Sequence, residues 1–185
     1  MRHLLSLIVV VSPAFAQGFL QNTDVSAMFG PATEPNVVIS PPPGPGYGAL
    51  VNQLSFGYQF LTLPNGSLLL EIPQTYVLQF AGNITFVTPG VRFKLPTATR
   101  FSPYAALGGG FGHFQTVASK VNGVLTTTSA NTYRPALDFG GGVDFRVARW
   151  FSLRGEIRDF VTPHDLGGAA GHNHPVFLLG FAFHS

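Results

Sequence analysis

Hydrophobic and polar residues alternate strictly through the stretch 133–160. From Tyr133 to Val147 every second residue is apolar, glycine or proline, and the residues between them carry all of the charge. A period of two over this length predicts a β-strand with one apolar and one charged face. The alternation pauses at Arg149-Trp150 and then resumes through Ile157 and Arg158. The stretch is therefore expected to form a long antiparallel hairpin.

The same alternation recurs along the chain and predicts six further strands. We expect them at 23–30, 49–61, 67–72, 83–95, 101–114 and 176–184. The pair Pro89-Gly90 predicts a bulge inside the fourth of these strands. The segments between strands are rich in proline, glycine or small polar residues, which predicts loops at 31–48, 73–82, 115–132 and 162–175. Together with the hairpin, this makes eight strands.

The lengths of the predicted connections alternate between long and short. The short ones are 64–67, 96–100 and 149–150. If both termini lie on one side, all short turns fall on that side and all long loops on the other, as in membrane barrels whose strands cross the bilayer at a tilt. The predicted fold class is all-β: an eight-stranded antiparallel up-and-down transmembrane β-barrel. A soluble exported β-sandwich or lipocalin-like binding protein, with the apolar face in a core, remains the alternative.

The N-terminus has the pattern of a secretory signal peptide. Arg2 and His3 precede an apolar segment at 4–11, and Ala14-Phe15-Ala16 forms a cleavage pattern before Gln17. We expect a cleaved signal peptide at 1–16, a barrel domain at 17–185, and export of the mature chain.

Composition narrows the class of protein further. Only 10% of residues are charged, and mean hydropathy is +0.27. Beyond the N-terminus no run of 18 apolar residues predicts a membrane helix. The absence of cysteine excludes disulfides, thiolate metal sites and cysteine nucleophiles. A net charge of +2, spread along the chain, gives no reason to expect nucleic acid as a partner.

These features together resemble the small eight-stranded outer-membrane barrel domains of the OmpA and OmpX type, over 17–185. The resemblance is carried by the signal peptide, the glycine-rich strand at 108–112, the aromatic last strand and the charged hairpin residues Asp144, Arg154, Glu156 and Arg158. It implies a monomer in the cell outer membrane that contacts outer-membrane lipid and is inserted by the barrel-assembly machinery. One departure is the C-terminus, because such barrels usually end on an aromatic residue, whereas here His184 and Ser185 follow Phe183.

The predicted inward faces collect acids and bases in nearly equal number. They are Asp24, Glu71, Asp138, Asp144 and Glu156, with Arg92, Lys94, Arg134, Arg146, Arg154 and Arg158. Eight strands enclose an interior just wide enough for side chains, and an unpaired buried charge costs several kcal/mol. We therefore expect a salt-bridge network that closes the lumen. A narrow porin-like channel through these charges is the alternative.

Candidate chemistry outside this network is sparse. Glu156 and Asp144 could form a catalytic carboxylate pair, but nearby arginines favour ionised structural roles. His113 and Ser119 lack the spacing of a triad, and the loop histidines His164, His172 and His174, which suggest a metal cluster, lack a scaffold and are expected to be solvated. We predict a non-enzymatic protein with no catalytic, cofactor or metal site. Its long outer loops would carry any specificity for an extracellular ligand.

Overall fold

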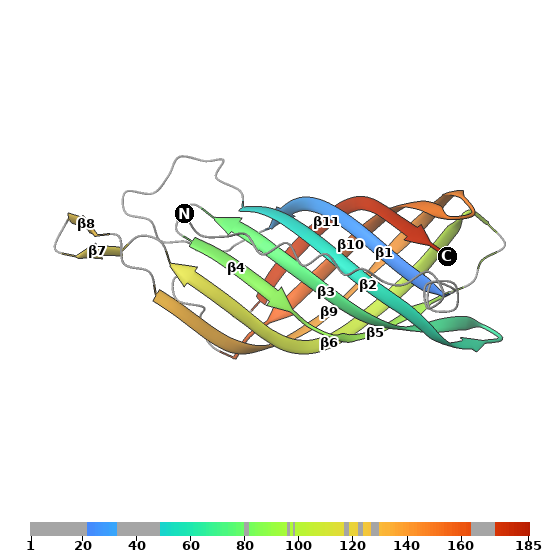
Figure 1. Ribbon diagram of the computed structural model, residues 1–185, viewed down its shortest axis with the longest axis horizontal. Helices are drawn as coiled ribbons and strands as arrows, with labels where there is room; N and C mark the ends of the chain where they lie inside the picture. The colour runs from blue at the N-terminus through green and yellow to red at the C-terminus, as the bar shows by residue number, and fades with distance from the viewer. Residues whose placement is uncertain are drawn as a thin grey trace, which may run out of the picture.

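The structure, a computed structural model, describes residues 22–32, 49–79, 82–95, 97, 99–116, 119–121, 124–126, 130–163 and 173–185. The predicted signal peptide at 1–16 lies outside the described residues. The strands are β1 (Thr23–Ala32), β2 (Ala49–Leu63), β3 (Gly66–Gln79), β4 (Gly82–Val87), β5 (Gly90–Lys94), β6 (Phe101–Thr116), β7 (Ser119–Val121), β8 (Val124–Thr126), β9 (Ala130–Ala148), β10 (Phe151–Val161) and β11 (Asn173–His184). Figure 1 shows the long strands running at a tilt around a common axis.

The sheet closes on itself. β1 pairs with β2 on one side and with β11 on the other, so the first and last strands leave no free edge. β4 and β5 each lie between β3 and β6, and form one strand interrupted at Thr88-Pro89, where the sequence predicts a bulge. Counted in this way, and apart from the small β7–β8 hairpin, the described strands form an antiparallel eight-stranded barrel. The predicted fold class is confirmed.

The two ends of the barrel differ as the loop lengths predict. The short turns β2–β3 and β9–β10 lie at the same end as the start of β1 and the end of β11; we call this the turn end. The β7–β8 hairpin projects beyond the opposite end, the loop end (Figure 1). The chain therefore runs up and down between a compact end and an end with long connections.

The third strand is longer than the sequence suggested, because it continues through Pro73 to Gln79. The carbonyl of Pro73 accepts a hydrogen bond from the Thr88 N–H at 3.4 Å, so the backbone of Pro73 faces the interruption between β4 and β5. Proline has no N–H to donate, but at this position the neighbouring ladder is already broken. The loop predicted at 73–82 is therefore wrong. Likewise, β9 begins at Ala130 and β11 at Asn173, earlier than expected.

The outer surface of the barrel is a belt of large apolar side chains. Its most exposed members include Leu179 at 74%, Leu137 at 63% and Leu107 at 60%. Soluble proteins rarely expose apolar patches above a few hundred Å². Closure of the sheet rules out the sandwich alternative, and this belt argues against a soluble lipocalin-like binder. Within the described residues no helix is both long and apolar enough to cross a membrane.

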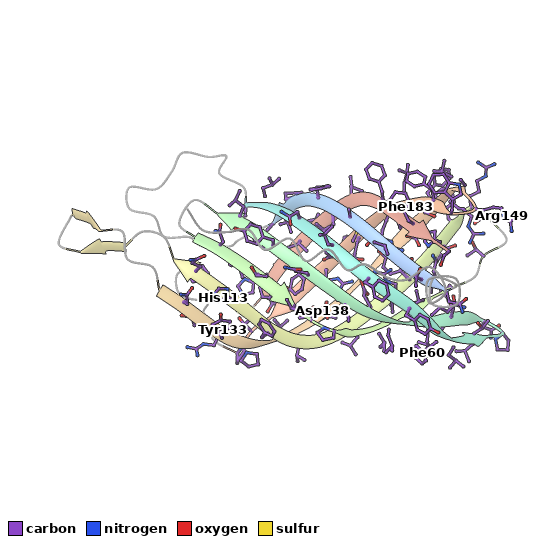
Figure 2. All side chains as sticks on the ribbon, in the orientation of Figure 1. Phe60, His113, Tyr133, Asp138, Arg149 and Phe183 are labelled. Atoms are coloured by element: carbon purple, nitrogen blue, oxygen red, sulfur yellow. The ribbon has the colours of Figure 1, made fainter. Side chains whose placement is uncertain are left out.

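Aromatic side chains gather on this surface near the turn end (Figure 2). Trp150 stacks on Phe183 with ring centroids 6.0 Å apart, and Phe151 stacks on Phe181 at 5.7 Å. Phe183 therefore provides an outward-facing aromatic side chain near the C-terminus, although it is not the last residue. Aromatic rings are typical of the level where a bilayer meets water.

Candidate functional site

The interior of the barrel is filled by two layers of inward side chains. The layer nearer the turn end is charged, and the layer nearer the loop end is apolar. The apolar layer consists of Met28, Ala32, Val51, Val77, Ile84, Phe86, Phe114, Ala136, Phe160, Val176 and Leu178. At its centre Phe86 of β4 and Phe160 of β10 stack with ring centroids 4.3 Å apart. The sequence predicted a charged lumen, and the separate apolar layer is an addition to it.

Arg154 of β10 connects two carboxylates from different strands. Its Nε donates to Asp144 of β9 at 2.6 Å, and its two terminal nitrogens donate to Asp24 of β1 at 2.8 and 2.7 Å. β11 lies between β10 and β1, and its residue opposite Arg154 is Gly180. An added Cβ at Gly180 would collide with the carbonyl oxygen of Ala27, so this glycine lets β11 and β1 approach closely beneath the guanidinium. Arg154 is 1% exposed.

Arg158, the second inward residue after Arg154 on β10, connects three carboxylates. Its Nε donates to Glu156 at 2.7 Å, and its terminal nitrogens donate to Asp138 of β9 at 2.5 Å and to Glu71 of β3 at 3.1 Å. β3 is not a neighbour of β10 in the sheet. Arg158 therefore ties together walls of the barrel that no backbone ladder joins.

Arg92 of β5 completes the network from the opposite wall. It donates to Asp24 at 3.1 Å and to Glu71, and it lies over the ring of Tyr104 with its guanidinium carbon 4.7 Å from the centroid. Lys94 is paired with Asp144 at 2.5 Å. Every buried carboxylate of the network thus has a cationic partner, as burial of charge requires. The salt-bridge network predicted from sequence is present.

Two of the predicted lumen bases are not part of this network. Arg146 is exposed at the turn end, where the register of β9 against β10 shifts. The irregularity lies between Arg146 and the turn, and Arg146 still pairs with the buried Ser152, so it belongs to the inward series as predicted. It lies at the turn end of the barrel, where its side chain is exposed and makes no ion pair with any described residue. Arg134 is half-buried near the loop end and makes no ion pair with any described residue. The described network therefore holds the acids Asp24, Glu71, Asp138, Asp144 and Glu156 and the bases Arg92, Lys94, Arg154 and Arg158.

The C-terminal residues close the network at the turn end. The Nδ1 atom of His184 lies 3.0 Å from Asp24, and its Nε2 atom lies 2.9 Å from the hydroxyl of Ser152. The hydroxyl of Ser185 lies 2.9 Å from that of Thr23. The two residues that follow Phe183 therefore bond to inward-facing groups on β1 and β10.

Neither a protein-family model nor a curated protein matches this sequence. Solved structures match the fold. Neisserial surface protein A aligns with a TM-score of 0.59 at 11% identity, over 88% of this chain and 94% of that one. The N-terminal β-barrel domain of Pseudomonas aeruginosa OprF aligns with a TM-score of 0.54 at 17% identity, over 88% and 97%. The outer membrane enzyme PagL aligns with a TM-score of 0.50 at 13% identity, over 86% and 97%.

The chain has the fold of the small outer-membrane β-barrels. At these identities the likeness concerns the fold alone. Because an outer membrane enzyme shares this fold, the fold by itself does not decide whether such a barrel catalyses a reaction. Whether this barrel could catalyse a reaction depends on which of its side chains lie together.

The candidate catalytic residues are not brought together in this barrel. Asp144 is bonded to Arg154 and Lys94, while Glu156 is bonded to Arg158, Gln53 and Tyr104, so the two carboxylates belong to different parts of the network. His113 stacks on Tyr133 with centroids 4.4 Å apart and bonds to Asn131 at 3.1 Å (Figure 2). The side chain of Ser119 lies outside the described residues.

The structure describes only one of the three predicted loop histidines. His164 and His172 lie outside the described residues. His174 is not a solvated loop residue: it lies on β11, is 1% exposed, and its Nε2 atom is 3.3 Å from the Thr162 hydroxyl. Its ring also lies 5.7 Å from that of Phe86, so it belongs to the apolar layer. Among the described residues, the atoms of Asp24, Asp144 and His184 lie close enough for a metal ion, but Arg154 already occupies both carboxylates.

A substitution at Tyr104 tests the contribution of a single hydrogen bond to the stability of the network. Its hydroxyl donates to Glu156 at 2.7 Å, and its ring lies beneath both Arg92 and Arg154. Tyr104→Phe keeps the ring and removes one hydrogen bond to a charged group. We expect it to lower the free energy of unfolding by about 1.5–3 kcal/mol in urea titrations. Tyr133→Phe, on the outer surface, is the matched control and should change stability by less than about 0.5 kcal/mol.

Proposed function

We propose that this chain is an integral outer-membrane protein in which a closed, non-catalytic barrel anchors long surface loops that make the functional contacts. The observation that carries this proposal is the burial of the lumen. Arg92, Ile84 and Phe86 are 0% exposed, so a sphere the size of water reaches none of them. A water-filled pore would expose such inward side chains. The barrel interior is thus suited to stability and not to transport.

The carboxylates of the lumen support a structural role for this layer. General acid–base catalysis needs a group whose proton can reach a substrate. Here the acids are held by arginines in a filled interior. The remaining variable part of the barrel is the set of long connections at the loop end, and loops on a rigid scaffold commonly carry recognition. We propose that the mature protein is a monomer, inserted by the barrel-assembly machinery, with its loop end at the cell surface.

The first test is membrane retention and heat-modifiability of the mature protein. We expect it to stay in the washed outer-membrane fraction and to migrate differently on a detergent gel before and after boiling. Recovery as a soluble, detergent-independent protein would contradict the membrane assignment.

Conductance then separates the closed barrel from the channel. In planar bilayers the folded protein is expected to give no current steps above background, while an established porin in the same bilayer gives them. Current steps whose size changes on substitution of Arg154 or Glu156 would replace the closed-barrel proposal with the narrow channel.

A further inference from the structure

Two arginines lie directly opposite each other on neighbouring strands at the turn end. β6 pairs with β9 so that Phe101 is opposite Phe145, and the Arg146 N–H donates to the carbonyl of Arg100 at 2.7 Å, which extends the ladder by one pair. The Cα atoms of such a hydrogen-bonded pair lie about 5.5 Å apart, and both side chains are on the same face of the sheet. The backbone therefore holds the two arginine side chains next to each other.

The face that carries this pair is the interior of the barrel. Arg146 is opposite Ser152 of β10, which is 1% exposed, and Arg100 stands two residues before Ser102 of β6, which is 5% exposed. Phe101, between Arg100 and Ser102, is 54% exposed on the outer surface. Both arginines are exposed. They therefore lie at the turn-end mouth of the lumen, where they face water and not lipid.

Neither arginine of the pair makes an ion pair with any described residue. The next inward residue of β9 is Asp144, and its carboxylate is already bonded to Arg154 and Lys94. Asp24, the other acid at this end of the network, is likewise bonded to Arg154. Like charges directly opposite each other on a sheet are destabilising. An anion between the two guanidinium groups would relieve this repulsion.

A buried hydroxyl lies beside the pair. Ser102 is the next inward residue of β6 after Arg100 and is opposite Asp144 of β9. It is buried, yet its hydroxyl makes no hydrogen bond with any described residue. A buried hydroxyl without a protein partner is stabilised when water or a ligand bonds to it. Ser102 is therefore available as a donor to a ligand held by the two arginines.

We propose that the turn-end mouth of the barrel binds one phosphate group, held by Arg100 and Arg146 with the Ser102 hydroxyl as a further donor. Each planar guanidinium can donate two hydrogen bonds at once to phosphate oxygens. A phosphate monoester carries a charge of about −1.5 to −2 at pH 7, which matches two arginines better than a single carboxylate does. Because the site faces the lumen, the phosphate comes from the water, as inorganic phosphate or a soluble monoester, and not from a lipid headgroup.

Arg149 is a matched control for this site. It is exposed at the same end of the barrel, but it lies in the turn between β9 and β10, outside the paired residues of the two strands. Arg149→Gln removes the same charge from the same end and leaves the opposed pair intact. A response that depends only on net charge at this end would change equally in this variant.

Urea unfolding of the full-length mature protein in phosphatidylcholine vesicles, at constant ionic strength with chloride replaced by inorganic phosphate, tests the site. A ligand that binds only the folded state raises the unfolding midpoint as the site fills. We expect a saturable rise for the wild type and for R149Q, and none for R100Q/R146Q. Each single glutamine variant should weaken the apparent affinity roughly tenfold or more, and Ser102→Ala several-fold. Heat-modifiability confirms that each variant is folded.

The same variants respond in the opposite direction when phosphate is absent. Arg100→Gln then removes the repulsion between the opposed side chains, so its unfolding midpoint should rise above that of the wild type. Arg149→Gln should leave the midpoint unchanged. A variant that is more stable without phosphate and less responsive to it separates a binding site from general damage to the fold.

Three results would overturn the proposal. An equal rise in R100Q/R146Q and wild type assigns the effect of phosphate to its general strengthening of burial. An equal rise with succinate in place of phosphate assigns the pair to carboxylates. A rise with phosphatidylglycerol vesicles that inorganic phosphate does not reduce assigns it to a lipid headgroup. The phosphate site does not depend on membrane location, so a soluble protein would defeat the proposed function without deciding this inference, which the titration decides.

Discussion

Arg158→Met is expected to lower the free energy of unfolding by about 3–5 kcal/mol, because it leaves buried carboxylates without their cation. Arg158 binds Glu71, Asp138 and Glu156, and it is the only described cation within ion-pair distance of Asp138. Methionine keeps an unbranched side chain of similar length, so the cost arises from charge more than from lost volume. Urea titrations of the folded barrel, followed by the fluorescence of the single tryptophan Trp150 and by gel migration, measure it.

A double-mutant cycle separates the ion pair from general damage. Arg158→Met leaves the Asp138 carboxylate without a cation, and Asp138→Asn removes that negative charge. The double variant should therefore recover part of the lost stability, with a coupling energy above about 1 kcal/mol. Arg149→Met, at the exposed turn end, is the control and should cost less than about 1 kcal/mol. A cost for Arg158→Met no larger than that of Arg149→Met would mean that the network does not hold the barrel together.

Much of the fold could be predicted from sequence because successive side chains of a β-strand point to opposite faces, so the apolar and polar faces alternate with a period of two. The alternation around Arg154 and Glu156 identified inward charges, and the segregation of short and long connections identified the up-and-down topology. Alternation gives the face of a residue but not its height along the axis or its partner across the lumen. That Arg158 reaches Glu71 on a distant strand depends on register and tilt, which no local pattern specifies.

The residues that were misplaced show where local patterns fail. Arg146 belongs to the inward series, since it pairs with the buried Ser152, but it lies so close to the turn end that its side chain is exposed. Pro73 predicts the end of a strand, yet the break in the neighbouring strand lets β3 continue. His174 lies in a segment rich in glycine and histidine that looks like a loop, and only the extended β11 turns it inward. For Pro73 and His174 the surrounding strands decide the outcome, and for Arg146 it is the position along the barrel axis.

Leu107→Arg is expected to cost about 2–4 kcal/mol when the barrel is folded in lipid vesicles. Leu107 lies near the middle of β6, faces outward at 60% exposure, and is opposite Phe139 of β9. At this level a bilayer offers hydrocarbon, where a guanidinium loses its water. The cost is measured as the change in urea unfolding between wild type and variant in the same vesicles.

Leu61→Arg makes the same chemical change at the turn end of β2, where the side chain is 43% exposed. Close to the headgroups an arginine costs only about 0–1 kcal/mol. The difference between the two variants therefore reports depth in the bilayer and not the general effect of an added charge. In water an exposed leucine can become arginine at little cost, so equal and small effects at both positions would contradict the assignment of the apolar belt to lipid.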